Sequence, residues 1–181
     1  MKLKITRQLL LRIFNFLLFY LGWGFSLSGV VRGHPYEGPI IVGCFLLYHL
    51  VQLRFHFPEI LLLITVGFFG TVNDTIYLNT GLIVYNGGYE SAPWLAPLWV
   101  TGIWMLFAMS VNHSLTWLRY HLLLAAVCGA GGGAVSYYAA ARVGAATFHP
   151  NDLVVTLIIG ALWFFIMPVL ILYSSWLTRR F

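Results

Sequence analysis

Three polar residues, Asn112, His113 and Ser114, directly follow one of the most apolar runs of the sequence, 97–110. A histidine can take up or release a proton near neutral pH, and an amide or a hydroxyl can bind a polar group of a ligand. The three residues lie close to the end of the run, yet they are too deep and too concentrated for an ordinary loop. Two interpretations stay open, which are hydrogen bonds between helices and a ligand-binding or proton-handling site.

Further polar residues are expected at a similar depth on other apolar runs. Asn15 lies on the first run, while His49 and Gln52 share one face of the second because they are three residues apart. Helical spacing directs Asn112 and His113 to different flanks of their own helix. We expect a polar cluster on the cytoplasmic side of a membrane, made of Asn15, His49, Gln52, Asn112, His113 and Ser114.

Asp74 is the acidic residue that the sequence places inside an apolar run. It recurs with Gly67 and Gly70 on one helical face, so the carboxylate should point at a neighbouring helix and not at lipid. An ionised group inside a bilayer costs roughly 2.5–3.5 kcal/mol on insertion scales, so it needs a partner or water. The other acids fall at helix ends or in loops, where they should be solvated: Glu37, Glu59, Glu90 and Asp152.

A partner for Asp74 is offered by the apolar run that ends near Ala141. Arg142 can extend roughly 6 Å toward the membrane core, so a network of Asp74, Tyr138 and Arg142 is expected if the two helices pack along their glycine-containing faces. This network is either an ion pair that fixes helix register or a polar pocket open to the outside or to the outer leaflet. The residues of this outward polar pocket are Asn73, Asp74, Tyr137, Tyr138 and Arg142.

The same run, 120–141, carries the clearest signal for close helix packing. Small residues recur every four positions at Ala125, Gly129 and Gly133, and the pattern continues to Tyr137. Small side chains let two helix backbones approach closely inside a membrane. We therefore expect this face to be a helix interface.

Several kinds of catalytic site are excluded by residue spacing. The six histidines form no HxxH or HxxxH pair, so a diiron site is not expected, and the sequence contains no HExxH, paired-aspartate or Walker motif. Ser114 cannot aim at the adjacent His113 along one helix, which argues against a serine protease. Asp74 has no acidic partner at its depth for two-carboxylate catalysis. Neither a metal ion nor another cofactor is expected.

Apolar runs determine the fold that must position these residues. Of the 181 residues, 60% are hydrophobic and 8% are charged, which is too apolar for a water-soluble globule of this size. A helix needs about 20 apolar residues to cross a bilayer. We expect one all-α transmembrane domain over 1–181, a bundle of six helices at about 12–31, 38–54, 58–80, 94–116, 120–141 and 153–175.

Basic residues indicate the orientation of the bundle, because Lys and Arg are retained on the cytoplasmic side during insertion. With six alternating helices, Arg32 and Arg142 fall outside and the other eight basic residues, Lys2 and Lys4 among them, fall inside. Both ends of the chain are therefore expected in the cytoplasm. The net charge of +5 is a topology signal, and no nucleic-acid partner is expected because no basic face lies outside the membrane.

The longest loop, from Asn79 to Pro97, is expected outside the membrane. Its segment 82–85, LIVY, is either re-entrant or interfacial. Aromatic residues in and near this loop should lie in the belt at the membrane surface, namely Tyr85, Tyr89, Trp94 and Trp99.

Three segments carry a likeness to a known family: LAPLWVTGIWMLFAMSVNHSLTWL at 95–118, GAGGGAVSYYAAARVGA at 129–145 and NFLLFYLGWGFSLSG at 15–29. Together they resemble domain of unknown function 2878, a family of small bacterial inner-membrane proteins. The resemblance implies a membrane fold and a location, and no reaction. Genes of this family often lie near those of methyltransferases similar to cyclopropane-fatty-acid synthase and those of flavin oxidoreductases, which implies by association only a role in membrane-lipid modification. The polar and aromatic positions shared with the family are Asn15, Asp74, Trp99, Trp104, Asn112, His113, Ser114, Tyr138 and Arg142.

Three functions are compatible with this sequence. The first is an inner-membrane protein that binds a lipid or fatty-acyl group and assists or performs its modification, with membrane lipids and a lipid-modifying enzyme as partners. The second is a small transporter or substrate-capture subunit, in which the two polar clusters lie along one pathway. The third is a structural membrane partner protein. The sequence decides neither whether the protein is an enzyme nor its oligomeric state.

Overall fold

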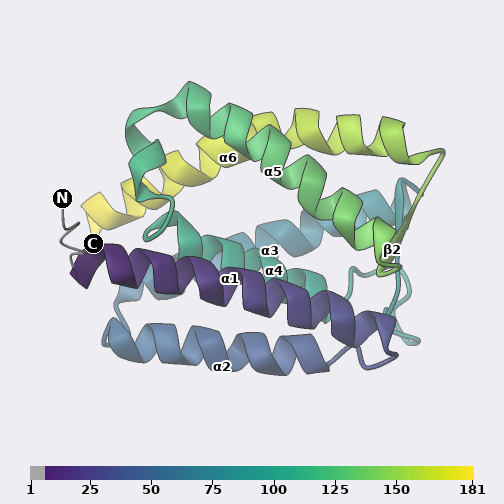
Figure 1. Cartoon of the computed structure of the whole chain (residues 1–181), viewed down its shortest axis with the longest axis horizontal. Coiled ribbons are helices and arrows are strands. Elements are labelled where there is room, and N and C mark those ends of the chain that lie inside the picture. The colour runs from purple at the N-terminus through teal and green to yellow at the C-terminus, as the bar shows by residue number, and fades with distance from the viewer. Residues whose placement is uncertain (1–6) are drawn as a thin grey trace, which may run out of the picture.

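The computed structural model describes residues 7–181, with side chains from Leu9 onward. Within these residues the fold is an all-α bundle of six helices, which confirms the predicted class (Figure 1). A short 3-10 helix, η1 (Thr116–Tyr120), and two strands, β1 (Ile83–Tyr85) and β2 (Ala146–Phe148), lie in the connections. The helices are α1 (Arg7–Val31), α2 (Glu37–Gln52), α3 (Phe57–Asn79), α4 (Leu98–Val111), α5 (Leu122–Arg142) and α6 (Asp152–Arg180).

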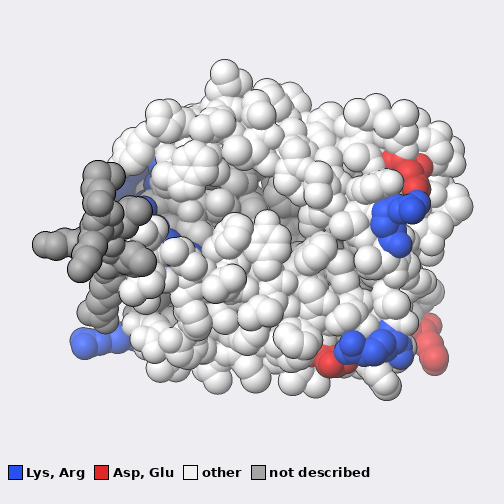
Figure 2. Space-filling view, viewed as in Figure 1, with Lys and Arg blue, Asp and Glu red and all other residues white. Residues whose placement is uncertain are grey.

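Four of the described helices are long and apolar enough to cross a membrane, namely α1, α3, α5 and α6, while α2 and α4 are apolar but shorter. The face drawn in Figure 2 carries its charged side chains at the two ends and a wide uncharged band between them. This distribution matches a bilayer core, which disfavours ionised groups. The protein is a membrane protein.

The start of α1 and the end of α6 lie at the same end of the bundle, as do the α2–α3 and α4–α5 connections (Figure 1). We call this the inner end and the opposite one the outer end. The basic residues predict that the inner end is cytoplasmic. Two of those residues, Lys2 and Lys4, lie outside the described part of the chain.

Helix α4 is shorter than the predicted 94–116, because it begins after Pro97 and ends at Val111. A proline disfavours helical backbone in the residue before it, so Ala96 cannot extend the helix. At the other end, the Ser110 carbonyl oxygen accepts from the backbone N–H groups of His113 and Leu115, three and five residues on, so the helical pattern of hydrogen bonds gives way to a turn.

Glycines set which helices pack closely. A Cβ atom on Gly70 of α3 would lie 2.0 Å from the Trp104 ring of α4, and one on Gly133 of α5 would lie 2.3 Å from the Trp163 ring of α6. The glycine faces therefore pair α3 with α4 and α5 with α6. The predicted helix interface on α5 is confirmed, but the expected packing of α3 on α5 along these faces is wrong.

The two strands form an antiparallel pair that the sequence analysis did not foresee. Ile83 lies opposite Phe148 and Tyr85 opposite Ala146, and all four side chains are buried. The pair joins the α3–α4 connection to the α5–α6 connection at the outer end. It also turns Tyr85 into the bundle.

The predicted surface belt of aromatic residues is only partly formed. Trp94 is 59% exposed, whereas Tyr85 and Trp99 are 8% and 3% exposed. The Trp99 indole N–H donates to the Asn86 carbonyl oxygen at 2.9 Å, and its ring contacts Tyr85 edge to face. These two residues were expected at the membrane surface and instead fill the outer end of the core.

Candidate functional site

Asp74 is fully buried and accepts hydrogen bonds from three other elements. The Trp104 indole nitrogen donates to Oδ2 at 2.7 Å, and the Tyr137 hydroxyl lies 2.9 Å from both carboxylate oxygens. The Tyr85 hydroxyl donates to Oδ1, and the Asn73 amide approaches Oδ2 at 3.5 Å. We call these five residues the Asp74 hub. It joins α3, α4, α5 and β1 through one carboxylate.

Tyr85 is the member of the hub that lies in a connection between helices. Burial, together with the nearby charge of Asp74, raises the pKa of its hydroxyl well above the ordinary value. Tyr85 therefore stays protonated and donates at neutral pH. The carboxylate is satisfied by neutral donors, which explains how an acid is tolerated at this position.

The expected network of Asp74, Tyr138 and Arg142 is not formed. Within residues 7–181, no hydrogen bond or ion pair joins Asp74 to Arg142, whose side chain is exposed at the end of α5. Tyr138 is 39% exposed and faces away from the hub that its neighbour Tyr137 completes. Adjacent helical residues point about 100° apart, so only one of the two tyrosines can reach the carboxylate.

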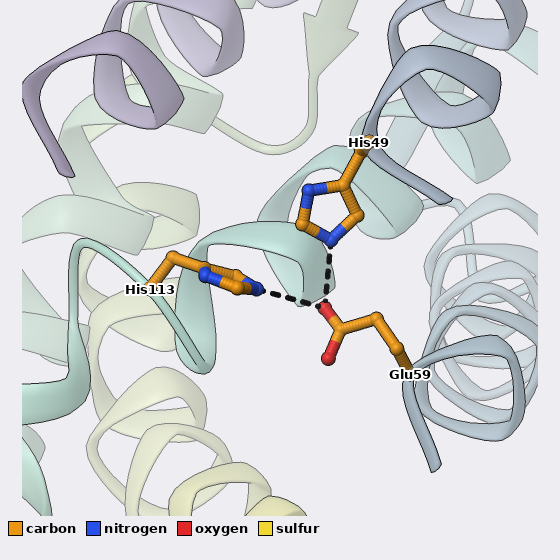
Figure 3. A group of neighbouring side chains, drawn as sticks. All are labelled: His49, Glu59 and His113. Carbon is orange, nitrogen blue, oxygen red and sulfur yellow. Dashed lines mark hydrogen bonds and ion pairs between the residues drawn. The ribbon is translucent and has the colours of Figure 1, made fainter. Parts of the chain in front are cut away.

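A second buried carboxylate lies at the inner end. Glu59 is 3% exposed, and its Oε1 lies 2.9 Å from His49 Nε2 and 3.4 Å from His113 Nε2. The Asn112 amide donates to Oε2 at 2.8 Å. We call these four residues the Glu59 cluster, and Figure 3 shows the two imidazole rings converging on the carboxylate.

Two expectations about this region were wrong. Glu59 was expected to be solvated at a helix end, but the short α2–α3 connection returns the chain beside His49 and places the first turn of α3 inside the bundle. Asn112 and His113 were expected to diverge, yet both contact Glu59. Their divergence assumed a continuing helix, and α4 has already ended at Val111.

Of the remaining predicted residues of the cytoplasmic-side cluster, Asn15 and Ser114 contact each other and Gln52 lies apart. Asn15 on α1 is buried, and its side-chain oxygen accepts from the Ser114 hydroxyl at 2.9 Å. Its amide donates to the Met109 carbonyl oxygen at 3.4 Å. Gln52 is exposed at the end of α2 and contributes to neither group. Asn15, His49, Asn112, His113 and Ser114 therefore do gather at the inner end.

Two residues that were not predicted to belong to a site support the Glu59 cluster. The Arg119 guanidinium of η1 and the Ser174 hydroxyl of α6 both donate to the side-chain oxygen of Asn112, and Arg119 reaches Ser174 at 3.3 Å. Arg119 is one of the eight basic residues that were expected at the inner side, and no contact was predicted for it. Its position seven residues after Asn112 was the available signal.

A cavity of about 350 Å³ lies between α1, α4 and α5 and extends from the Asp74 hub to Ser110 and Ser114 near the inner end. Most of its wall is aromatic or aliphatic. The wall includes exposed residues on both rims, such as Tyr20 of α1 and Val135 of α5. The cavity therefore opens sideways between these helices, where the surface in Figure 2 is hollowed. We call it the α1–α5 cavity.

Two features of the wall bear on what this cavity holds. Within the described part of the chain, the Trp163 indole nitrogen is buried without a hydrogen-bond partner, although Trp163 stacks on Trp104 at 5.0 Å between ring centres. Gly132 lines the cavity, and a Cβ atom there would meet nothing within 4 Å. The cavity thus has room beside a glycine, while the unpaired indole nitrogen lies buried behind its wall.

Comparison with known proteins gives a family and no activity. No curated protein and no solved structure matches the chain. Residues 12–169 match the family described as protein of unknown function (DUF2878), which covers all six helices in whole or in part. The chain belongs to the DUF2878 family.

Proposed function

We propose that this protein binds one acyl chain, from a lipid or a free fatty acid, in the α1–α5 cavity. The observation that carries the proposal is an apolar cavity of about 350 Å³ that opens sideways at the level of the apolar band. Its volume lies in the range of small-molecule sites, about 300–1,000 Å³. A ligand that enters from the side of the bundle comes from the bilayer, where acyl chains are the abundant apolar groups.

Polar groups near the inner end of the cavity favour a chain that carries a polar end. The hydroxyl groups of Ser110 and Ser114 line this end, and a hydroxyl oxygen can accept a hydrogen bond. The Trp163 indole nitrogen is buried away from the open space, so this ring contributes apolar wall. The rest of the wall includes Phe19, Trp23 and Ile103, which suit methylene groups.

The arrangement favours binding over reaction within the cavity. Asp74 is the carboxylate in the wall, and its oxygens already accept from Tyr85, Trp104 and Tyr137. We propose that the protein presents its acyl chain to a lipid-modifying enzyme of the bacterial inner membrane. A pathway for polar solutes is less favoured, because the wall between the two polar ends is apolar.

Replacing Gly132 by leucine should fill the cavity and reduce acyl binding at least about tenfold, because the new side chain occupies the space of several methylene groups. The purified protein is loaded with oleate in one arm and with phosphatidylglycerol in the other, and native mass spectrometry counts the ligands that stay bound. We expect one retained ligand per chain for the wild type. The two arms distinguish a free fatty acid from a phospholipid.

Gly131→Leu is the matched control. Gly131 belongs to the same glycine run, a Cβ atom there also meets nothing within 4 Å, and the residue does not line the cavity. The proposal requires the wild type and Gly131→Leu to retain a ligand that Gly132→Leu loses. Equal retention by all three proteins, or retention by none in both arms, would reject acyl binding in this cavity.

A further inference from the structure

The Glu59 cluster contains a set of donor atoms that resembles a metal site. We propose that His49, Glu59 and His113 bind a divalent first-row transition-metal ion at the inner end of the bundle. The three ligands come from the last turn of α2, the first turn of α3 and the turn after α4 (Figure 3). Because they lie far apart in the sequence, a search for closely spaced histidines could not find them.

The distances between donor atoms are close to those of a bound ion. The Nε2 atoms of His49 and His113 lie 2.9 and 3.4 Å from Glu59 Oε1, and all three donor atoms lie within 4.8 Å of one another. Metal–ligand bonds of about 2.1 Å at tetrahedral angles separate the ligand atoms by about 3.4 Å. From a separation of at most 4.8 Å, the two imidazole nitrogens need to approach each other by up to about 1.4 Å, and His49 needs to move about 0.5 Å away from the 2.9 Å contact with Glu59, which side-chain rotations allow.

His113 adds a detail that favours a cation. Its Nε2 atom is buried and lies 3.4 Å from Glu59 Oε1, but within the described residues it makes no hydrogen bond, to this oxygen or to another atom. A buried nitrogen without a partner is unfavourable. Coordination by its lone pair to a cation would satisfy the atom. His49 Nε2 already meets the same oxygen, so a single ion could replace the crowded contact of two imidazoles with one carboxylate.

Residues around the three ligands fix the carboxylate. Asn112 donates to Oε2, which leaves Oε1 facing the imidazoles, and Asn112 is itself held by Arg119 and Ser174. Metal sites in proteins commonly have such supporting hydrogen bonds to their ligands.

The donor set also indicates which ions fit. Two imidazole nitrogens and one carboxylate oxygen suit Zn²⁺, Fe²⁺ or Co²⁺, whereas Ca²⁺ and Mg²⁺ prefer oxygen ligands. Three protein ligands leave at least one coordination position for water or another small ligand. The His113 side chain is 29% exposed although its Nε2 atom is buried, so the proposed site lies just beneath the surface.

The test uses tag-free protein in detergent, stripped with a chelator and titrated with Zn²⁺. We expect one Zn²⁺ per chain by calorimetry, a higher unfolding temperature with Zn²⁺ present, and a visible absorption spectrum when Co²⁺ replaces Zn²⁺. X-ray absorption of the wild-type protein should show nitrogen and oxygen ligands that include two imidazoles. This measurement needs no variant, so it decides the case even if substitutions prevent folding.

Glu59→Gln and His113→Gln should each weaken Zn²⁺ binding at least ~100-fold, because each removes one ligand. His56→Gln and His121→Gln are the controls, since both histidines are exposed near the same end and neither belongs to the cluster. The proposal is overturned if wild-type protein binds no stoichiometric Zn²⁺, if the control variants lose binding equally, or if the spectrum shows sulfur ligands. The Gly132→Leu protein should bind Zn²⁺ normally, so this result is independent of the proposed acyl binding.

Discussion

Asp74→Ala is expected to lower the free energy of unfolding by about 3–5 kcal/mol, because removing one partner of a buried polar network leaves the others unpaired. Tyr85, Trp104 and Tyr137 would each lose the acceptor that their buried groups share. Three elements would lose their common attachment to α3. Denaturant unfolding in detergent micelles, followed by tryptophan fluorescence, measures the loss.

Arg142→Ala serves as the control for this prediction. Arg142 is exposed and has no ion pair with Asp74, so its loss should leave stability nearly unchanged. The double variant should therefore be as unstable as Asp74→Ala alone. If removing Arg142 restores part of the stability that Asp74→Ala loses, the two residues interact and the Asp74 hub is wrong.

Gly70→Ala should lower the free energy of unfolding by about 1–3 kcal/mol, because overpacking forces neighbouring groups to shift. The added Cβ atom would lie 2.0 Å from Cγ of the Trp104 ring, far inside van der Waals contact. Trp104 cannot move without breaking its hydrogen bond to Asp74 and its stacking on Trp163. Thermal unfolding in detergent should show a clear decrease in the unfolding temperature.

Gly43→Ala makes the same chemical change on α2, where an added Cβ atom meets nothing within 4 Å. This variant should be as stable as the wild type or slightly more stable, because alanine favours a helix more than glycine does. Equal destabilisation by the two substitutions would contradict the close packing of α3 on α4.

The fold could be predicted where the signal was local. The long apolar runs placed α1, α3 and α5 well, because a membrane-spanning helix requires a continuous apolar segment. Both ends of α4 were misplaced. The residues before Pro97 are also apolar, so the start was predicted too early. The polar residues after Val111 were counted as part of the helix, although they form a turn. The strands were missed because each has three residues and pairs with a segment far along the chain.

The sequence predicted several of the polar residues that lie inside the bundle. It did not predict which of them contact one another. Helical periodicity placed Asp74 on a packed face, and it is fully buried there. Its partners depend on which helices are neighbours, which periodicity does not reveal, so neutral aromatic donors occupy the place expected for Arg142. Glu59 was wrongly expected in solvent because the prediction took the first turn of a helix to be solvated. In the structure the end of α2, with His49, covers this turn.

The strand pair and the Arg119–Ser174–Asn112 contacts have a joint mechanical consequence. Helices α5 and α6 are fastened to the other four helices at the outer end by β1 with β2 and by Tyr137 with Asp74, and at the inner end by Ser174. Between these fastenings α5 faces α1 across the cavity. Trp163 of α6 also stacks on Trp104 of α4 in the interior. The opening between α1 and α5 is therefore a side entrance in a bundle that is joined elsewhere, and a chain that enters there passes neither water-facing end.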